Sequence, residues 1–186
     1  MSEIILLRHA KVDIKKDKKI YANQLDDFIK QYDNSDITLE LSNYTEIENL
    51  LNSTNIHICS KQKRSIQSLQ LFKKIPYRID KIFNEATLNN TKRKLFKLST
   101  NLWLIIFRIL WLISFSNKTN SYKQTKIRAK KASQVLINLA NEHKKIILIG
   151  HGIMNNLIQK ELLKHNYILS KKSNNKNWDY SVLKSI

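Results

Sequence analysis

Two arginines and two histidines stand where three apolar segments of the chain end. Arg8 and His9 directly follow the first segment, Arg64 lies shortly after the second, and His151 comes directly after the third. Arginine donates paired N–H groups to an anion and stays charged at any working pH, and histidine exchanges a proton near neutrality. If the segments are parallel strands of one sheet, their carboxyl ends bring these side chains to one crevice. The sequence therefore predicts an anion-binding site.

Glycine usage marks the position of His151. A chain of this length and average composition holds about 13 glycines, whereas this chain holds two, Gly150 and Gly152, on either side of His151. Glycine permits a positive φ and a close approach of the backbone to a ligand. We therefore expect one of these features where the third apolar segment meets the helix that follows it.

Short apolar runs alternate with longer helical patterns along the chain, which is typical of an α/β domain. Three runs predict short strands, at least two of them central in a sheet: 3–7, 55–59 and 145–149. Three longer stretches predict helices: 60–72, 127–142 and 153–164. Ser60 is expected to cap the first of these helices.

The remaining segments are less regular. Residues 178–183 predict an edge strand, and the polar, basic stretches 13–34 and 84–100 are expected to form loops or short helices over the sheet. No repeat or linker divides the 186 residues. We therefore expect a single domain over 1–186.

Motifs along the chain resemble those of the histidine phosphatase superfamily, also called phosphoglycerate-mutase-like. The matching residues are, in chain order, Leu7-Arg8-His9-Ala10; Ser60, Arg64, Ser65, Gln67 and Ser68; Asn84-Glu85-Ala86; Ile149-Gly150-His151-Gly152; and Trp178-Asp179-Tyr180-Ser181. The resemblance spans nearly the whole chain. It implies a three-layer α/β/α sandwich around a mostly parallel central sheet.

The resemblance implies a role for each of these side chains. His9 is expected to attack phosphorus in line and to form a phosphohistidine, with its other ring nitrogen held by a backbone carbonyl. Arg8, Arg64 and His151 are expected to bind the phosphoryl oxygens and to stabilise the charge of the transition state. Glu85 is expected to protonate the leaving alcohol and then to activate water. No metal ion or other cofactor is expected.

Two features depart from the family pattern or leave it ambiguous. Ala10 stands where the family has glycine after the histidine, and its methyl group either narrows the approach to phosphate or is tolerated. Asp80 lies near Glu85 in the sequence and is an alternative acid. Neither feature removes the expected nucleophile.

The implied function is cleavage of phosphomonoesters of small molecules. A phosphoglycerate-type mutase uses the same chemistry, but the chain is shorter than typical mutases, which carry extra segments over the site. A non-catalytic module with this fold that binds phosphate or nucleic acid is another alternative, suggested by the net charge of +18. Because the lysines are scattered and no nucleic-acid-binding motif accompanies them, nucleic acid is not the expected partner.

Residues 102–115 form the longest apolar stretch, with Arg108 near its centre. A membrane-spanning helix needs about 20 apolar residues, so this stretch is expected to form a buried helix packed over the sheet. The alternative is peripheral contact with an anionic bilayer through Trp103, Phe107 and Trp111.

The cysteine and N-terminal patterns favour a cytoplasmic protein. Cys59 is the single cysteine, which excludes a disulfide framework, and no basic residue precedes the short apolar run at the N-terminus, so no signal peptide is expected. Cys59 is expected to pack in a strand. His57, His143 and His165 lack ligand-like spacing and are expected to be structural or exposed. The oligomeric state leaves no signal in the sequence.

Overall fold

The computed structural model of the chain describes residues 1–15, 17–40, 42–88, 91–113 and 121–186. Its strands are β1 (Glu3–Arg8), β2 (Lys19–Tyr21), β3 (His57–Cys59), β4 (Arg78–Ile79), β5 (Lys97–Ser99), β6 (Lys145–Gly150), β7 (Tyr167–Lys171) and β8 (Tyr180–Ser185). Its α-helices are α1 (Leu25–Asn34), α2 (Tyr44–Asn52), α3 (Lys63–Gln70), α4 (Thr100–Ile113), α5 (Tyr122–His143) and α6 (Gly152–Leu162). Two 3-10 helices are η1 (Ala22–Gln24) and η2 (Lys81–Phe83).

The central sheet has six strands in the order β4-β3-β6-β1-β8-β7. The pairs β3–β4, β3–β6 and β1–β6 are parallel, whereas β1–β8 and β7–β8 are antiparallel. The three predicted strands are therefore neighbours in a mostly parallel sheet. The prediction that 178–183 form an edge strand is wrong, because the chain after α6 folds back as β7 and pairs with the outer side of β8.

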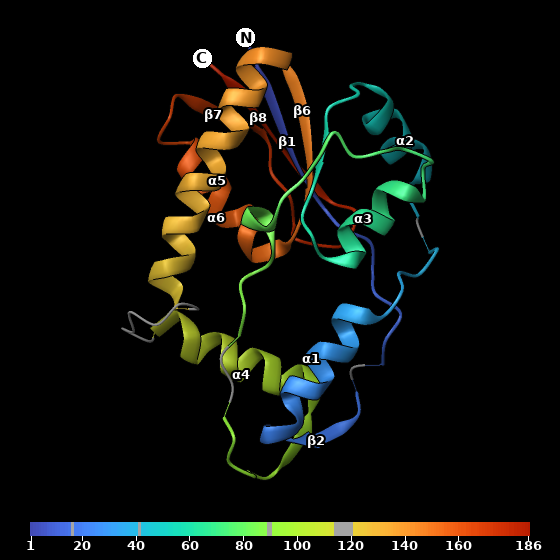
Figure 1. Cartoon of the computed structure of the whole chain (residues 1–186), viewed down its shortest axis with the longest axis vertical. Helices are drawn as coiled ribbons and strands as arrows, with labels where there is room; N and C mark the ends of the chain where they lie inside the picture. Colours follow the sequence, from blue (N-terminus) through green and yellow to red (C-terminus); the bar gives the residue numbers. More distant parts are fainter. Residues whose placement is uncertain (16, 41, 89–90, 114–120) are drawn as a thin grey trace.

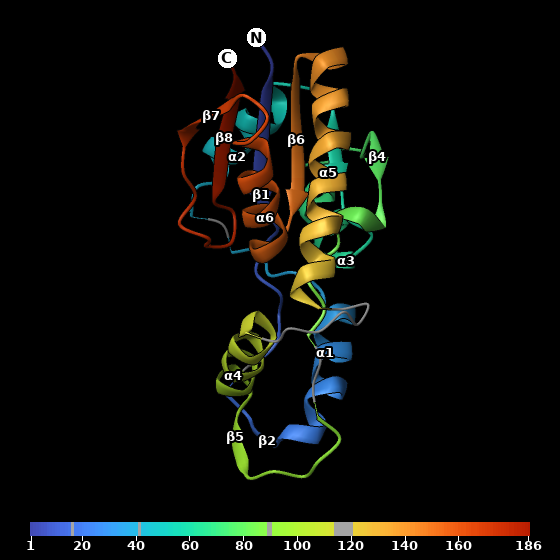
Figure 2. The same ribbon diagram turned by 90° about the vertical axis from the view of Figure 1, so that its left-hand side faces the viewer.

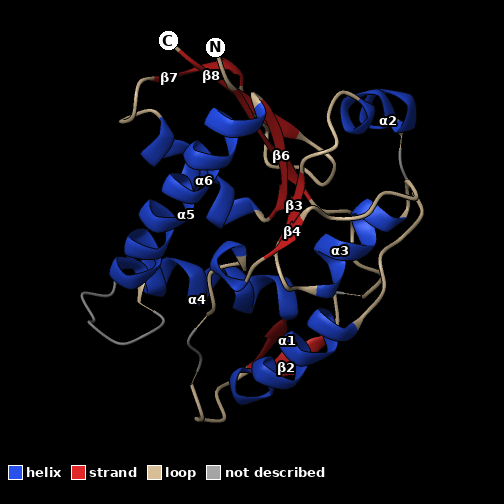
Figure 3. Ribbon diagram, turned by 45° about the horizontal axis from the view of Figure 1, so that its top comes forward, coloured by secondary structure: helices blue, strands red, loops and turns tan. Residues whose placement is uncertain are grey.

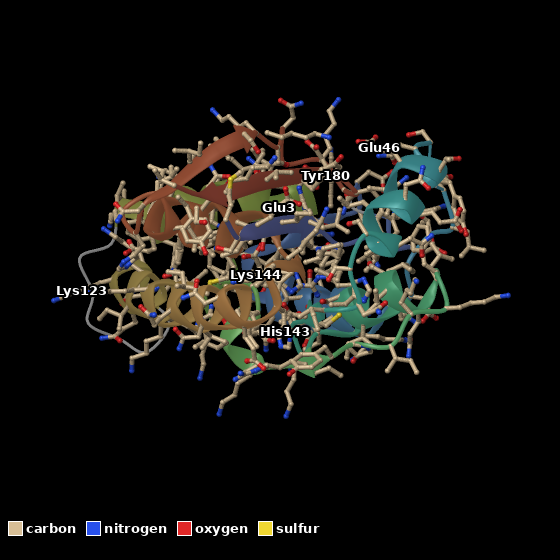
Figure 4. The ribbon with its side chains drawn as sticks, turned by 90° about the horizontal axis from the view of Figure 1, so that it is seen from above. Glu3, Glu46, Lys123, His143, Lys144 and Tyr180 are labelled. Carbon is tan, nitrogen blue, oxygen red and sulfur yellow. The ribbon has the colours of Figure 1, made fainter. Side chains whose placement is uncertain are left out.

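Helical layers cover both faces of this sheet (Figure 3). Ile4 and Leu6 of β1 pack on the face covered by α5 and α6, while Ile5 and Leu7 pack on the face covered by α2 and α3. Successive strand residues point to opposite faces of the sheet. A continuous apolar run in β1 therefore packs against the helices on both faces. The predicted three-layer α/β/α sandwich is confirmed. At its edge the Tyr180 hydroxyl donates to Glu46 Oε1 at 2.8 Å, which ties β8 to α2 (Figure 4).

A separate group of elements lies beyond the carboxyl ends of the parallel strands (Figures 1 and 2). We call it the cap; it comprises β2, α1, β5 and α4. Leu25, Phe28, Trp103 and Phe107 form its apolar cluster, and β2 pairs with β5. The prediction that 13–34 and 84–100 lie over the sheet is wrong, because other helices already cover both faces of the sheet.

Helix α4 buries only one side. Trp103, Phe107 and Trp111, spaced four residues apart, are buried, whereas several aliphatic side chains of the same helix are exposed. The prediction of a buried helix is therefore wrong for the outer side of α4. The alternative of bilayer contact through the three aromatic residues is wrong as well, because their side chains are buried. Residues 114–115, the end of the predicted stretch, lie outside the described residues. Within the described ranges, no helix combines the length and apolarity needed to cross a membrane.

Two side chains expected to be structural are buried in the sheet layer. Burial raises the pKa of the Cys59 thiol to about 12, so this cysteine is not a reactive thiolate. His57 lies with Nε2 2.9 Å from the carbonyl of Leu51, and burial lowers its pKa. The contact of His57 with Leu51 ties β3 to α2.

Candidate active site

His9 is fixed at the carboxyl end of β1. Its amide donates to the carbonyl of Gly150 at 3.1 Å, and the residue is 3% exposed. Nδ1 lies 2.6 Å from the carbonyl of Ala10, and the Nε–H of Arg64 donates to Nε2 at 3.2 Å. Because a carbonyl only accepts and a guanidinium only donates, these contacts assign the proton to Nδ1 and leave a lone pair on Nε2. A nitrogen nucleophile requires this tautomer.

Ala10, the departure from the family pattern, lies outside the cavity lining. Its amide donates to the Ser68 hydroxyl at 2.8 Å, and its methyl group is buried in the cluster on the α2 and α3 face. The methyl group therefore fills the core and does not narrow the approach to His9.

Arg64 is held by the cap as well as by its own helix. It is the second residue of α3 and is 4% exposed. Its Nη1 donates to Asp33 Oδ1 at 2.5 Å, and its guanidinium lies 4.9 Å from the centre of the Tyr32 ring. Both partners belong to α1, so α1 orients the guanidinium toward His9.

Arg8 lies beside His9 at the same strand end, in register with Gly150. Its Nη1 donates to the carbonyl of Asn175 in the loop before β8. Its Nε is buried and has no hydrogen-bond partner among the described residues. A buried donor without an acceptor costs about 1–3 kcal/mol, and an anion in the cavity would supply that acceptor.

His151 occupies the N-cap position of α6 and is fully buried. Its ring centre lies 5.0 Å from that of His9. Burial, reinforced by the positive charges of Arg64 and Arg8, lowers its pKa well below the ordinary 6.5. The ring is therefore neutral near pH 7, and it acts as a hydrogen-bonding group rather than as a cation. It is not among the residues that line the cavity, and its expected contact with the phosphoryl oxygens stays a prediction.

Ser60 contacts His151 and is not a helix cap. Helix α3 begins at Lys63 with Gln62 at the N-cap position, so the prediction for Ser60 is wrong by two residues. The Ser60 hydroxyl instead lies 2.7 Å from Nε2 of His151 and accepts from the amide of Gln62 at 3.2 Å. Ser60 thus fixes the orientation of the second histidine ring.

Of the two glycines that flank His151, Gly150 is required by a close contact and not by backbone conformation. Neither has a positive φ, so that part of the expectation is wrong. A Cβ on Gly150 would lie 2.1 Å from Oδ1 of Asn155, which accepts from the His151 amide at 3.3 Å. A Cβ on Gly152 would meet Arg8 at 3.6 Å, an ordinary contact. The close approach at Gly150 is therefore to a side chain of α6.

Glu85 lines the cavity, and Asp80 does not. The Glu85 carboxylate accepts from the amides of Ile153 at 3.2 Å and Met154 at 3.0 Å, in the first turn of α6. Asp80 instead caps η2 by accepting from the amide of Ile82 at 3.0 Å. The geometry favours Glu85 over Asp80 as the group that could reach a bound ester.

The side chains meet in a cavity of about 700 Å³ between the sheet and the cap. Its polar lining includes Arg8, His9, Asp33, Arg64, Glu85 and Arg108. Its apolar lining includes Phe28, Ile29, Leu104, Ile105 and Ile109. The cavity therefore joins a cationic floor at the strand ends to an apolar wall formed by α1 and α4.

Three further residues that shape the site were not predicted from the sequence. Asp33 binds Arg64, Arg108 donates to the carbonyl of Ala86 at 3.3 Å, and Arg128 donates to the carbonyl of Asn84 at 2.5 Å. Arg108 carries a sequence signal, since it is the single charge in the apolar stretch. Asp33 and Arg128 lie in segments rich in charged residues, so nothing in the sequence distinguishes them from their neighbours.

Comparison with known proteins gives matches among solved structures. No protein-family model and no curated protein sequence matches the chain. Phosphoserine phosphatase from Entamoeba histolytica, solved with 3-phosphoglyceric acid, matches with a TM-score of 0.62 and 19% identity over 98% of this chain and 90% of that chain. Mycobacterial glucosyl-3-phosphoglycerate phosphatase, solved with VO3, matches with a TM-score of 0.60 and 14% identity over 99% and 93% of the two chains.

These two structures align with nearly the full length of the chain, but the sequence identity is low. Bacillus stearothermophilus YhfR is similar as well, with a TM-score of 0.56 and 13% identity over 88% of this chain and 81% of that chain. At these identities the likeness concerns the arrangement of helices and strands. The chain has the fold that these solved structures share, as its motifs predict.

Proposed function

We propose that the chain is a cytoplasmic phosphohydrolase that cleaves phosphomonoesters of small molecules through a phosphohistidine on His9. One observation carries the proposal: Arg64 Nε and His9 Nε2 lie 3.2 Å apart in the lining of one cavity. A phosphoryl group placed there meets a guanidinium and a nitrogen lone pair together. Solved neighbours named as phosphatases support phosphatase chemistry at the level of the superfamily.

In the first step a bound phosphoryl oxygen takes over the Nε–H of Arg64, which frees the lone pair on Nε2 of His9. Nε2 then attacks phosphorus in line with the ester oxygen. The P–N bond forms, the P–O bond to the alcohol breaks, and Glu85 gives a proton to the departing oxygen. Arg8 and Arg64 bear the charge of the equatorial oxygens. The contact from Nδ1 to the carbonyl of Ala10 stabilises the positive ring that results.

In the second step water attacks the phosphohistidine. Glu85 takes a proton from the water, the P–N bond breaks, and inorganic phosphate leaves with His9 restored. The two arginines supply the positive charge at phosphorus, and the proposal includes no metal ion. The apolar wall formed by Phe28, Ile29 and Leu104 would receive the alcohol portion of the ester.

Hydrolysis of p-nitrophenyl phosphate in EDTA tests the proposal, because its aryl group suits an apolar wall. The wild type, His9→Ala and His165→Ala are purified and assayed side by side; His165 is exposed and serves as the matched control. The wild type and His165→Ala should release p-nitrophenol at equal rates, and His9→Ala should release none. Equal rates from all three proteins would refute a nucleophilic His9.

Two further assays separate this proposal from the alternatives with the same fold. Incubation with 3-phosphoglycerate and a trace of the 2,3-bisphosphate should release inorganic phosphate or leave the substrate unchanged. Interconversion without phosphate release would identify a mutase. Retention on DNA or RNA at physiological salt, with no turnover of any phosphomonoester, would identify a binding module.

A further inference from the structure

Helix α4 presents a row of aliphatic side chains to solvent. Six of them are between 42% and 63% exposed: Leu102, Ile105, Ile109, Leu110, Leu112 and Ile113. We call these residues the α4 face. The helix carries two polar side chains after its first residue, Asn101 and Arg108, and both line the cavity instead. A contiguous apolar face of this kind marks a binding surface rather than an ordinary solvated helix.

The segment that contains the α4 face is free of acidic residues. From 86 to 141 the sequence has 11 Lys and Arg and no Asp or Glu. Glu85 and Glu142 bound this segment. A long stretch of one charge sign beside an apolar face indicates a partner that is both apolar and anionic.

Lysines stand at both ends of α4. At its N-terminal end Lys94 and Lys97 lie 4.7 and 4.9 Å from the centre of the Tyr21 ring. At its C-terminal end the ring of Trp111 packs edge-on against Tyr122, over which Lys126 lies at 5.7 Å. Figure 2 shows α4 at the outside of the molecule, away from the sheet. The α4 face is thus apolar in the middle and cationic at both ends.

We propose that the α4 face docks on the surface of an anionic lipid bilayer. The aliphatic side chains enter the boundary between headgroups and acyl chains, and the flanking lysines contact the anionic headgroups. The helix lies in the plane of the bilayer surface, since its 14 residues are too few to span it. A second copy of the chain would cover the aliphatic side chains but would set two acid-free basic segments against each other.

Docking in this way brings the cavity to the bilayer. Ile105 and Ile109 belong to the α4 face and also line the cavity. The two residues therefore connect the docking surface with the apolar wall of the site. Binding to lipid does not depend on turnover, so it is measured independently of the proposed function.

Sedimentation with lipid vesicles tests the docking surface. The wild type should pellet with phosphatidylcholine vesicles that contain phosphatidylserine and should remain in solution with pure phosphatidylcholine. The variant Leu110→Gln/Ile113→Gln, which changes exposed residues outside the cavity lining, should bind at least about tenfold more weakly. The matched control Ile75→Gln/Ile168→Gln changes two exposed isoleucines elsewhere and should bind like the wild type.

A second pair of variants tests the contribution of charge. Lys94→Gln/Lys97→Gln should weaken binding about tenfold or more, since each lysine near an anionic surface contributes about 1 kcal/mol. Lys144→Gln/Lys172→Gln removes the same charge from exposed positions away from α4 and should have a smaller effect. Raising the salt concentration should release the wild type from the vesicles.

Three outcomes would overturn the proposal. The wild type fails to pellet with the anionic vesicles at low salt, or the Leu110→Gln/Ile113→Gln variant pellets as well as the wild type. Alternatively, light scattering finds a dimer that this variant dissociates, in which case a second copy covers the α4 face. Circular dichroism of each variant, matched to that of the wild type, establishes that the proteins compared are folded.

Discussion

The carboxylate of Asp33 accepts a hydrogen bond from Nη1 of Arg64 at 2.5 Å. The same guanidinium donates through Nε to His9, so a residue of the cap is linked to the expected nucleophile through one arginine. A phosphoryl group that binds Arg64 must share it with Asp33 or displace that carboxylate. Asp33 therefore sets how readily the site accepts an anion.

Replacing Asp33 by asparagine should strengthen the binding of inorganic phosphate by roughly three- to tenfold, because it removes a partly exposed negative charge beside the anion. Asparagine retains an acceptor for Arg64, and the Tyr32 ring still supports the guanidinium. Isothermal titration with phosphate measures the effect, with the exposed Asp27→Asn on the same helix as control. Weaker phosphate binding by Asp33→Asn alone would show that Asp33 serves to position Arg64.

Glu85 and Asp80 are distinguished by the leaving group of the substrate. Glu85→Gln should lower kcat/KM, which reports transfer to His9 and not hydrolysis of the phosphohistidine, by about 10²- to 10⁴-fold for an alkyl phosphate, whose alkoxide needs a proton. The loss should be smaller for p-nitrophenyl phosphate, because p-nitrophenolate leaves without one. Asp80→Asn should leave kcat unchanged for both substrates. Equal losses for the two substrates in Glu85→Gln would contradict the role of Glu85 as the acid.

The two glycines should differ in their tolerance of a methyl group. Gly150→Ala should lower the free energy of unfolding by about 1–3 kcal/mol, because the new Cβ displaces the side chain of Asn155. Gly152→Ala should leave stability unchanged or raise it by up to about 1 kcal/mol, since alanine favours the helix that begins there. Urea denaturation of both variants checks this order, and equal destabilisation would refute it.

The stability of the protein should fall as the pH drops below 6.5. Burial lowers the pKa of His151 and of His57 in the folded state, so below the ordinary value of 6.5 the unfolded chain binds more protons. Each histidine therefore contributes stability that is complete above pH 6.5 and decreases by up to about 1.4 kcal/mol per pH unit as the pH falls.

Urea denaturation from pH 7.5 to about 5, above the range in which most carboxylates titrate, measures this slope. His151→Gln and His57→Gln should each reduce it by up to about one proton. A slope that neither substitution changes would place the titration in other groups.

The sequence pattern predicts those strands and helices that the local spacing of apolar residues defines. The apolar run from Ile4 to Leu7 has no polar position, which predicts a strand covered on both faces, and the structure bears this out. Because Arg8 and His9 follow that strand and Arg64 begins the helix after another, parallel pairing is enough to bring them together. The structure places all three in the lining of one cavity.

Features that depend on contacts between distant segments were not predictable in this way. Asp33 resembles any acidic residue of an exposed helix until α1 packs beside α3. The place of β8 depends on β7, a mostly exposed strand with a weak apolar pattern. The apolar residues of α4 predict a helix, but they do not reveal which of its sides the rest of the chain covers.

Transfer of the phosphoryl group to His9 is tested most directly by trapping the covalent enzyme. The wild type and His9→Ala are mixed with a phosphomonoester that carries a radiolabelled phosphoryl group, denatured within one turnover and mapped by peptide. The label should be on the peptide that contains His9, stable to alkali and labile to acid, and absent from His9→Ala. Label on another residue, or steady turnover by the wild type with no covalent label, would contradict a phosphohistidine at His9.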